Sequence, residues 1–182
     1  MQMDPIEVTD KLGRKVVLRS ADVTDASDLM VYMNIVSGET PFLVRTPGEF
    51  KLSIQQEQNF ILSRLTDPGA LLMMASIDGR HVGNCSFYAL SPYKRYGHRC
   101  IVSIALYQKY WNAGIGEEML KKALEIAKQT GYTQAELEVL TSNTPAIAMY
   151  EKLGFKKYGS FPDSVCFEDG HFEDSDWMMK KL

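Results

Sequence analysis

Two glycines, Gly114 and Gly116, stand where an apolar stretch ends and a helical pattern begins. Apolar residues then recur at spacings of three and four as far as Gly131, which predicts an amphipathic helix. A glycine loop that opens a helix leaves several backbone N–H groups without partners, with the positive end of the helix dipole behind them. The stretch therefore predicts a site for phosphate or pyrophosphate.

The same two glycines could also form nothing more than a tight turn. No Gly-Lys-Ser/Thr follows them, so the loop is not a Walker loop. Glu117 and Glu118 come directly after Gly116, which excludes the GxGxxG fingerprint of dinucleotide-binding folds. An unrelated nucleotide-binding α/β protein is therefore not favoured, and residues outside the loop must decide between a turn and an anion site.

Length and composition set the class of protein. At 182 residues we expect a single domain, 1–182, that buries a substantial core. The net charge of −3 and the lack of a basic run argue against nucleic acid as a partner. Three scattered cysteines, Cys85, Cys100 and Cys166, fit neither a disulfide framework nor a metal site. No apolar run approaches the roughly 18 residues of a membrane span, and the N-terminus does not read as a signal peptide, so we expect a cytoplasmic protein that contacts no membrane.

The elements that must position the loop follow from hydrophobic patterning. Seven strands are predicted, over residues 15–19, 70–77, 82–90, 98–106, 134–140, 155–160 and 176–181. Helices are predicted over about 26–36, 46–65, 115–130 and 143–153. The order indicates an α/β (α+β) fold: a mixed, mostly antiparallel seven-stranded sheet flanked by about four helices, with a right-handed crossover between the fourth and fifth strands.

Two local features complete this outline. Thr46-Pro47-Gly48-Glu49 predicts the start of the second helix, with a Thr cap, a Pro in the first turn and a Glu that closes a capping box. An acidic loop is expected between the last two strands, within residues 163–174.

Two segments resemble the GCN5-related N-acetyltransferase (GNAT) superfamily. Residues 110–116, YWNAGIG, are similar to its acetyl-CoA loop, Arg/Gln-x-x-Gly-x-Gly/Ala. Residues 143–155, NTPAIAMYEKLGF, resemble its Asn-x-x-Ala-x-x-x-Tyr-x-x-x-Gly-Phe helix, and the order of elements fits as well. The close of the chain, 169–174 with 177–179, resembles the subgroup that acetylates ribosomal-protein N-termini and polyamines. Trp111 departs from the pattern, because it stands at the Arg or Gln position.

The resemblance implies an acetyl-CoA-dependent N-acetyltransferase that uses no metal. The fourth and fifth strands would splay apart near Leu106 and Tyr107, and pantetheine would add to the fourth strand as an extra strand. The amides of residues 112–116 would hold the pyrophosphate. The expected cofactor-binding residues are Leu106, Tyr107, Trp111, Asn112, Ala113, Gly114, Ile115, Gly116, Asn143 and Tyr150.

The catalytic roles also come from the resemblance. Tyr150 would protonate the departing thiolate, although it could instead be only a core aromatic. Asn143 would contact the cofactor, cap its helix before Pro145, or do both. A backbone N–H near Ala105 or Leu106 would stabilise the tetrahedral intermediate.

The general base is left open by the sequence. Relatives often carry a Glu on the fourth strand, and this strand has none. Ser103 could orient a water, and Glu138, Glu136 or His98 could accept the proton. A water relay or an amine of low pKa would remove the need for any base.

The acceptor side is expected to involve the first two helices, the loop 91–97 and the acidic loop. Its carboxylates could attract a cationic amine such as a polyamine, a peptide N-terminus or an aminoglycoside, or could serve only solubility. Tyr88, Tyr93 and Tyr96 could line a pocket or simply pack. The alternative to an enzyme is a catalytically weak acyl-CoA-binding sensor or interaction module of the same fold. A monomer and a homodimer both remain open.

Overall fold

A single sheet of eight strands runs through the computed structural model, which describes residues 1–182. Its strand order is β1-β2-β3-β4-β5-β6-β8-β7, and every neighbouring pair is antiparallel except the parallel pair β5 and β6. The strands are β1 Ile6–Thr9, β2 Lys15–Ser20, β3 Leu71–Ile77, β4 Arg80–Ala89, β5 Arg99–Leu106, β6 Gln134–Leu140, β7 Lys156–Cys166 and β8 Phe172–Lys181. The predicted mixed, mostly antiparallel sheet is confirmed.

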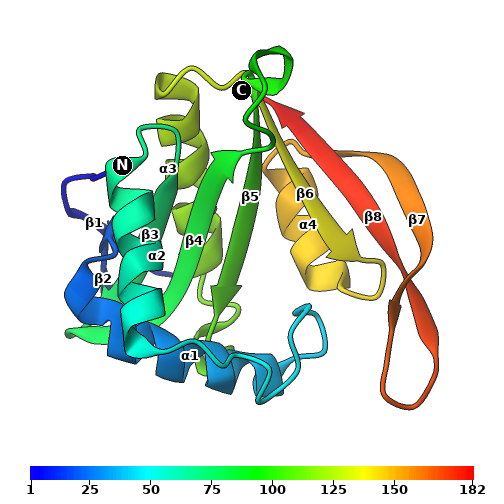
Figure 1. Cartoon of the computed structure of the whole chain (residues 1–182), viewed down its shortest axis with the longest axis horizontal. Coiled ribbons are helices and arrows are strands. Elements are labelled where there is room, and N and C mark those ends of the chain that lie inside the picture. The colour runs from blue at the N-terminus through cyan, green and yellow to red at the C-terminus, as the bar shows by residue number, and fades with distance from the viewer.

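Four α-helices flank the sheet: α1 Ala26–Glu39, α2 Ile54–Thr66, α3 Ile115–Gln129 and α4 Thr144–Lys152. Short 3-10 turns lie at Val23–Asp25, Lys94–Tyr96 and Gln108–Tyr110. In Figure 1, α1 and α2 lie in front of the sheet and α3 lies behind it. We call the side of the sheet that carries α1 and α2 the α1/α2 face, and the side that carries α3 and α4 the α3/α4 face.

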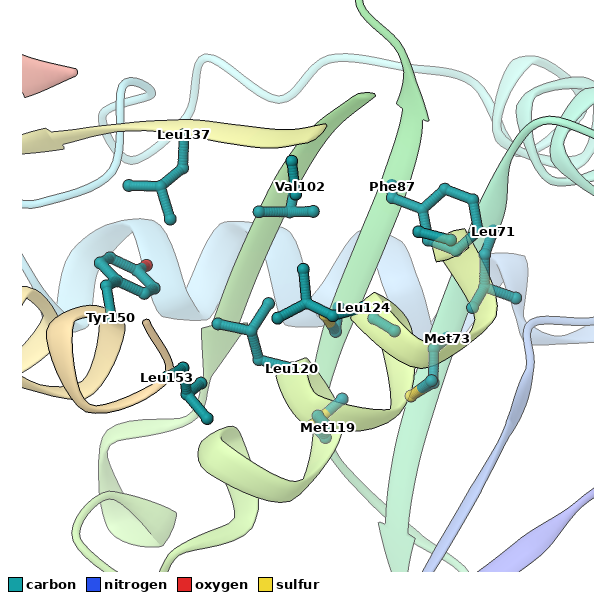
Figure 2. Close-up of a cluster of buried hydrophobic side chains, with 14 of the residues drawn as sticks. Leu71, Met73, Phe87, Val102, Met119, Leu120, Leu124, Leu137, Tyr150 and Leu153 are labelled. Atoms are coloured by element: carbon teal, nitrogen blue, oxygen red, sulfur yellow. The ribbon is translucent and has the colours of Figure 1, made fainter. Parts of the chain in front are cut away.

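The larger core lies on the α3/α4 face. It joins buried side chains of β3, β4, β5 and β6 to α3 and α4, and Figure 2 shows Leu120 and Leu124 of α3 together with Tyr150 of α4 and Leu153, which follows that helix. A smaller cluster, which includes Leu29 of α1 and Ile61 of α2, covers the other face. The smaller cluster packs on Leu72 and Met74 of β3, so this strand is covered on both faces of the sheet.

The sheet has one strand more than the seven predicted. The additional strand, β1, has only four residues and pairs with β2 alone at the edge of the sheet, so it buries none of its side chains fully. Ile6 and Val8 alternate with Glu7 and Thr9, but two repeats are too few to identify a strand from the sequence.

The expected acidic loop is also wrong in its extent. β7 and β8 continue through most of it and pair as far as Cys166 and Phe172, so the turn covers only residues 167–171. The acidic residues here stand in adjacent pairs, Glu168-Asp169 and Glu173-Asp174, and not in alternation, which hides the strand character of this exposed hairpin.

The second helix starts later than predicted. Thr46 and Glu49 do bond to each other, but Gly48 between them has φ +84°, a left-handed conformation that cannot continue a helix. α2 is instead capped by Ser53, whose hydroxyl accepts from the Gln56 N–H while the Gln56 side chain accepts from the Ser53 N–H. The sequence contains two capping boxes, and only the second opens a helix.

Candidate active site

β5 and β6 pair only at their beginnings. The ladder joins Arg99–Ile101 to Gln134–Glu136, and the two strands then continue separately to Leu106 and Leu140. Figure 1 shows them diverging as the two arms of a V. The predicted splay is present, but it opens after Ile101 and not near Leu106 and Tyr107 as expected.

The open edge of β5 presents backbone groups to this gap. The Tyr107 N–H donates to Val82 O at 3.0 Å and Leu90 N–H donates to Arg99 O at 3.1 Å, so odd-numbered residues of β5 bond to β4. Because bonding direction alternates along a strand, even-numbered residues such as Ile104 turn their backbone groups toward the gap. This edge can accept an extended ligand as one further strand.

Trp111 occupies the last backbone carbonyl at the end of this strand edge. Its indole N–H donates to Leu106 O at 2.9 Å, so the last carbonyl of the edge already has a donor. The alternating direction of the backbone groups also distinguishes the two N–H groups that were expected to stabilise the oxyanion. The N–H of Leu106 faces the gap, whereas the N–H of Ala105 faces β4.

The glycine loop carries a run of backbone N–H groups without protein partners. From Asn112 to Glu117, no backbone N–H donates a hydrogen bond within the protein. Asn112 with φ +61° and Gly114 with φ +82° turn the chain just before α3, which is how successive amides come to point at one place. We call this row of amides at the N-terminus of a fifteen-residue helix the cradle, because such an arrangement can hold an anion.

Gly116 has a separate packing role. A Cβ there would lie 3.3 Å from Leu106 Cδ1 and 3.5 Å from Ile104 Cδ1. The missing side chain therefore lets the first turn of α3 sit directly against the open edge of β5. The amide cradle and the strand edge are thereby held side by side.

Two carboxylates in the first turn of α3 would repel an anion if they were free. Glu117 instead accepts from Lys121 at 2.8 Å and from Lys152 at 2.7 Å, which lowers the pKa of Glu117 to about 2. Glu118 is paired with Lys121 at 2.9 Å. Their charges are balanced locally, so the cradle keeps its positive character.

Tyr150 comes from α4 on the α3/α4 side of the gap. It is 8% exposed, packs 5.9 Å from the Phe155 ring and makes no hydrogen bond to protein through its hydroxyl. Burial raises the pKa of Tyr150 above its usual value, so the hydroxyl keeps its proton at neutral pH. Figure 2 shows the ring among the side chains of the larger core. The residue is both a core aromatic and an unpartnered donor.

Asn143 caps α4 from the rim of the gap. Its side-chain oxygen accepts from the Ala146 N–H at 3.3 Å, and Pro145 occupies the first turn. The amide nitrogen of Asn143 has no protein partner, so it can donate to a ligand while the cap is kept.

The side chains that could act as general base differ in their exposure and in their hydrogen-bond partners. The Glu136 carboxylate is buried and receives hydrogen bonds from Arg99, from Gln134 at 2.8 Å and from Tyr158 at 3.3 Å. The Arg99 guanidinium holds the pKa of Glu136 below its usual range, which makes it a poor base. Exposed His98 precedes β5 at the closed end of the strands.

Glu138 and Ser103 lie on the α1/α2 face beside the gap. Glu138 is exposed and accepts a hydrogen bond from Ser175 alone. Exposed Ser103 bonds to Ser86 across the β4–β5 pair at 2.8 Å. Leu137, the neighbour of Glu138, belongs to the core with Tyr150, so Tyr150 lies on the opposite face of the sheet from Glu138 and Ser103.

Sequence reasoning missed Tyr32. Its hydroxyl donates to Ala105 O at 2.6 Å, and its ring packs 4.5 Å from His81 and 5.0 Å from Tyr107. The pattern contained a signal, since Tyr32 lies three residues after Leu29 and four before Val36 on the buried stripe of α1. Tyr32 therefore ties α1 to the end of β5.

The residues expected around the acceptor are partly occupied by other contacts. Arg64 lies 4.9 Å from the Tyr88 ring and Arg99 lies 5.3 Å from the Tyr96 ring, whereas Tyr93 is fully solvent-facing at 73% exposure. Glu173 accepts from the Ser142 N–H at 2.8 Å. Asp174 accepts from the Asp163 N–H at 2.9 Å within the β7–β8 hairpin, whereas Glu173 ties the hairpin to the loop after β6. None of the helices is both long and apolar enough to cross a membrane.

Comparisons with known proteins agree with this geometry. The model of the acetyltransferase (GNAT) family matches residues 34–155. An N-alpha-acetyltransferase of Sulfurisphaera tokodaii is 28% identical over 159 residues, covering 81% of this chain and 84% of that protein. The structure of a GNAT-family acetyltransferase from Streptococcus pneumoniae superposes with a TM-score of 0.88 at 28% identity, covering 92% and 99% of the two chains. YncA of Salmonella typhimurium, solved with its cofactor acetyl-CoA, gives a TM-score of 0.81 at 17% identity over 92% and 94%.

Proposed function

The chain belongs to the acetyltransferase (GNAT) family and is an acetyltransferase, and on that premise we propose that it moves an acetyl group from acetyl-CoA to a primary amine by direct attack in a ternary complex. The observation that carries the proposal is the row of unpartnered amides from Asn112 to Glu117 beside the open edge of β5. Residues 1–182 act together in this proposal as one catalytic domain.

Acetyl-CoA would bind along two surfaces that meet at Gly116. The pyrophosphate lies on the amides of Asn112, Ala113, Gly114, Ile115 and Gly116. Pantetheine extends along β5 toward Ile101 and bonds to the even-numbered residues. Tyr107 and Trp111 flank this path, and the free amide of Asn143 contacts the cofactor from the opposite rim.

The acetyl transfer then uses both faces of the gap. The amine nitrogen attacks the thioester carbonyl carbon from the α1/α2 face, and a backbone N–H of β5 that faces the gap at the far end of the pantetheine path stabilises the developing oxyanion. The C–S bond breaks as the amide forms, and the sulfur takes a proton from the Tyr150 hydroxyl. The proton lost by the amine passes to Glu138, directly or through a water that Ser103 orients.

The acceptor class is proposed from the relatives. The Sulfurisphaera protein is an N-alpha-acetyltransferase, so a peptide N-terminus is the first acceptor to test on this chain. Polyamines and other small amines are the second group, in keeping with the resemblance of the C-terminal segment.

A catalytically weak acyl-CoA sensor is the second candidate. It is favoured by the absence of a carboxylate on β5 and by Trp111, whose indole occupies the carbonyl of Leu106. The unpartnered Tyr150 hydroxyl and the exposed Glu138 favour an enzyme, because both proton-transfer groups border the gap.

Thermal unfolding with and without acetyl-CoA tests the shared premise. A ligand at 100 times its dissociation constant adds about 2.7 kcal/mol to the stability of the folded state, which raises the midpoint by several degrees. We expect this shift with acetyl-CoA and none with ATP or NAD. No shift at millimolar acetyl-CoA contradicts the proposed cofactor site.

Release of free thiol in the presence of peptide or polyamine acceptors then separates enzyme from sensor. A cofactor-dependent midpoint shift without thiol release from any acceptor supports the sensor.

A further inference from the structure

The glycine loop has no cationic side chain of its own for the phosphates. Residues 111–116 are Trp-Asn-Ala-Gly-Ile-Gly, and the Trp111 indole is bonded to Leu106 O. Lys109, just before the loop, lies over the rings of Tyr107 and Tyr110 at 5.5 and 5.1 Å. A doubly charged pyrophosphate would therefore meet neutral amides alone, unless another segment supplies a cation.

The turn between β1 and β2 places Lys11 on this loop. The Lys11 N–H donates to Ala113 O at 2.9 Å, which docks the turn against the cradle. The side chain of Lys11 then runs over Gly114. A Cβ at Gly114 would lie 3.1 Å from Lys11 Cγ and 3.2 Å from its Cε. The ammonium group is one bond beyond that Cε, beside the row of free amides.

The turn that carries Lys11 is well ordered by Asp10. The buried carboxylate of Asp10 accepts from the N–H groups of Leu12 and Arg14, each at 2.9 Å, and pairs with the Arg14 guanidinium at 2.7 Å. The neighbouring cation Lys15 is paired with Glu7. Exposed Lys11 has no acidic partner, so its charge is available to a ligand.

We propose that Lys11 binds the pyrophosphate of acetyl-CoA and supplies the positive charge that the loop lacks. This assignment rests on the proposed function, because it needs the cofactor in the cradle. It gives the short hairpin β1–β2 a role in the site, although it is far from the loop in sequence. A lysine is suited to this role as a mobile point charge that complements the directional amide donors.

The test measures the dissociation constant for acetyl-CoA by titration calorimetry, which needs no acceptor. Lys11→Met is expected to weaken binding about three- to tenfold, as for one solvent-exposed charged contact. Lys11→Arg is expected to keep most of the affinity. Lys128→Met is the matched control, because exposed Lys128 at the end of α3 also lacks an ion pair and lies away from the cradle. The difference between wild type and Lys11→Met should shrink at 0.5 M salt, where charges are screened.

Acetyl-dephospho-CoA identifies the phosphate that Lys11 contacts, since it keeps the pyrophosphate and lacks the 3′-phosphate. If Lys11→Met loses the same affinity for both ligands, the proposal is supported. If it loses affinity for acetyl-CoA alone, Lys11 contacts the 3′-phosphate and the proposal is overturned. Equal affinities of wild type and Lys11→Met, or an equal loss in Lys128→Met, also overturn it. If wild-type protein does not bind acetyl-CoA, the proposed function itself fails, and the two failures are distinguishable.

Discussion

The Arg99 guanidinium lies against the Glu136 carboxylate where the pairing of β5 with β6 ends, with Arg99 Nη2 and Glu136 Oε2 2.6 Å apart. Beyond this point the two strands separate. The ion pair thus fastens the closed end of the gap, and the Tyr158 hydroxyl bonds the same carboxylate from β7. Glu136 is a structural residue that happens to lie two positions from a candidate base.

Removal of Arg99 is expected to destabilise the fold. Arg99→Met leaves a buried carboxylate without its cation and should lower the free energy of unfolding by about 3 kcal/mol, measured by urea denaturation. Arg99→Met combined with Glu136→Met should recover part of this loss, because no buried charge is left unpaired. If Arg99→Met alone is as stable as wild type, the ion pair has no structural role.

Replacement of Tyr150 separates its catalytic role from its packing role. Tyr150→Phe keeps the ring and removes a hydroxyl that has no protein partner, so stability and acetyl-CoA affinity should be unchanged. We expect kcat to fall about 10²- to 10⁴-fold if the hydroxyl protonates the thiolate. Tyr132→Phe is the matched control, since it loses a hydrogen bond to Gly69 O, 2.8 Å away, and should affect stability and not turnover. Unchanged kcat in Tyr150→Phe would leave this residue as a core aromatic alone.

Glu138 is expected to act on the amine. Glu138→Gln should lower kcat about tenfold or more near neutral pH and change the acidic limb of its pH profile, while the dissociation constant for acetyl-CoA stays the same. Glu151→Gln removes an exposed carboxylate on α4 and serves as the control. Identical pH profiles for wild type and Glu138→Gln would show that water alone takes the proton.

His81 should make stability depend on pH. It is largely buried against Tyr32, its Nδ1 has no partner, and burial lowers the pKa of His81 below the ordinary 6.5. The unfolded chain therefore binds more protons than the folded chain in the window just below pH 6.5, so stability rises with pH through that window. The stability that depends on neutral His81 is fully present above about pH 6.5 and is lost as the pH falls below that value.

Urea midpoints between pH 5 and pH 8 check this sign. His81→Gln should flatten the dependence between about pH 5.5 and 6.5, because it removes the group whose pKa is lowered by burial in the folded chain. A dependence that persists in full without His81 would assign it to other groups.

The strongest local signals predicted their elements well. The residues of β6 were found from alternation, and α4 from Asn143 before Pro145. The α2 start was misplaced because two capping boxes lie close together, and the φ of Gly48 is not visible in the sequence.

The sequence predicted where the site lies but not which side chains in it are free to act. The glycine loop was located by its residues, yet Glu136 and Glu138 look alike in a strand that alternates. Only the sheet brings Arg99 to one of them, from a strand 37 residues away in the chain. The contacts of Lys11 and Tyr32 also depend on tertiary packing, which local patterns do not record.

The placement of Tyr150 and Glu138 on opposite faces of the sheet has a consequence for the reaction cycle. The proposed acid and the proposed base are different groups on the two faces of the sheet, so neither has to reverse its protonation before the other can act. Acidic and alkaline inactivation would then report two independent residues, and a substitution at one would shift one limb of the rate profile without moving the other. The route by which the acetylated amine leaves would also be distinct from the surface that holds spent CoA, so either product could depart first.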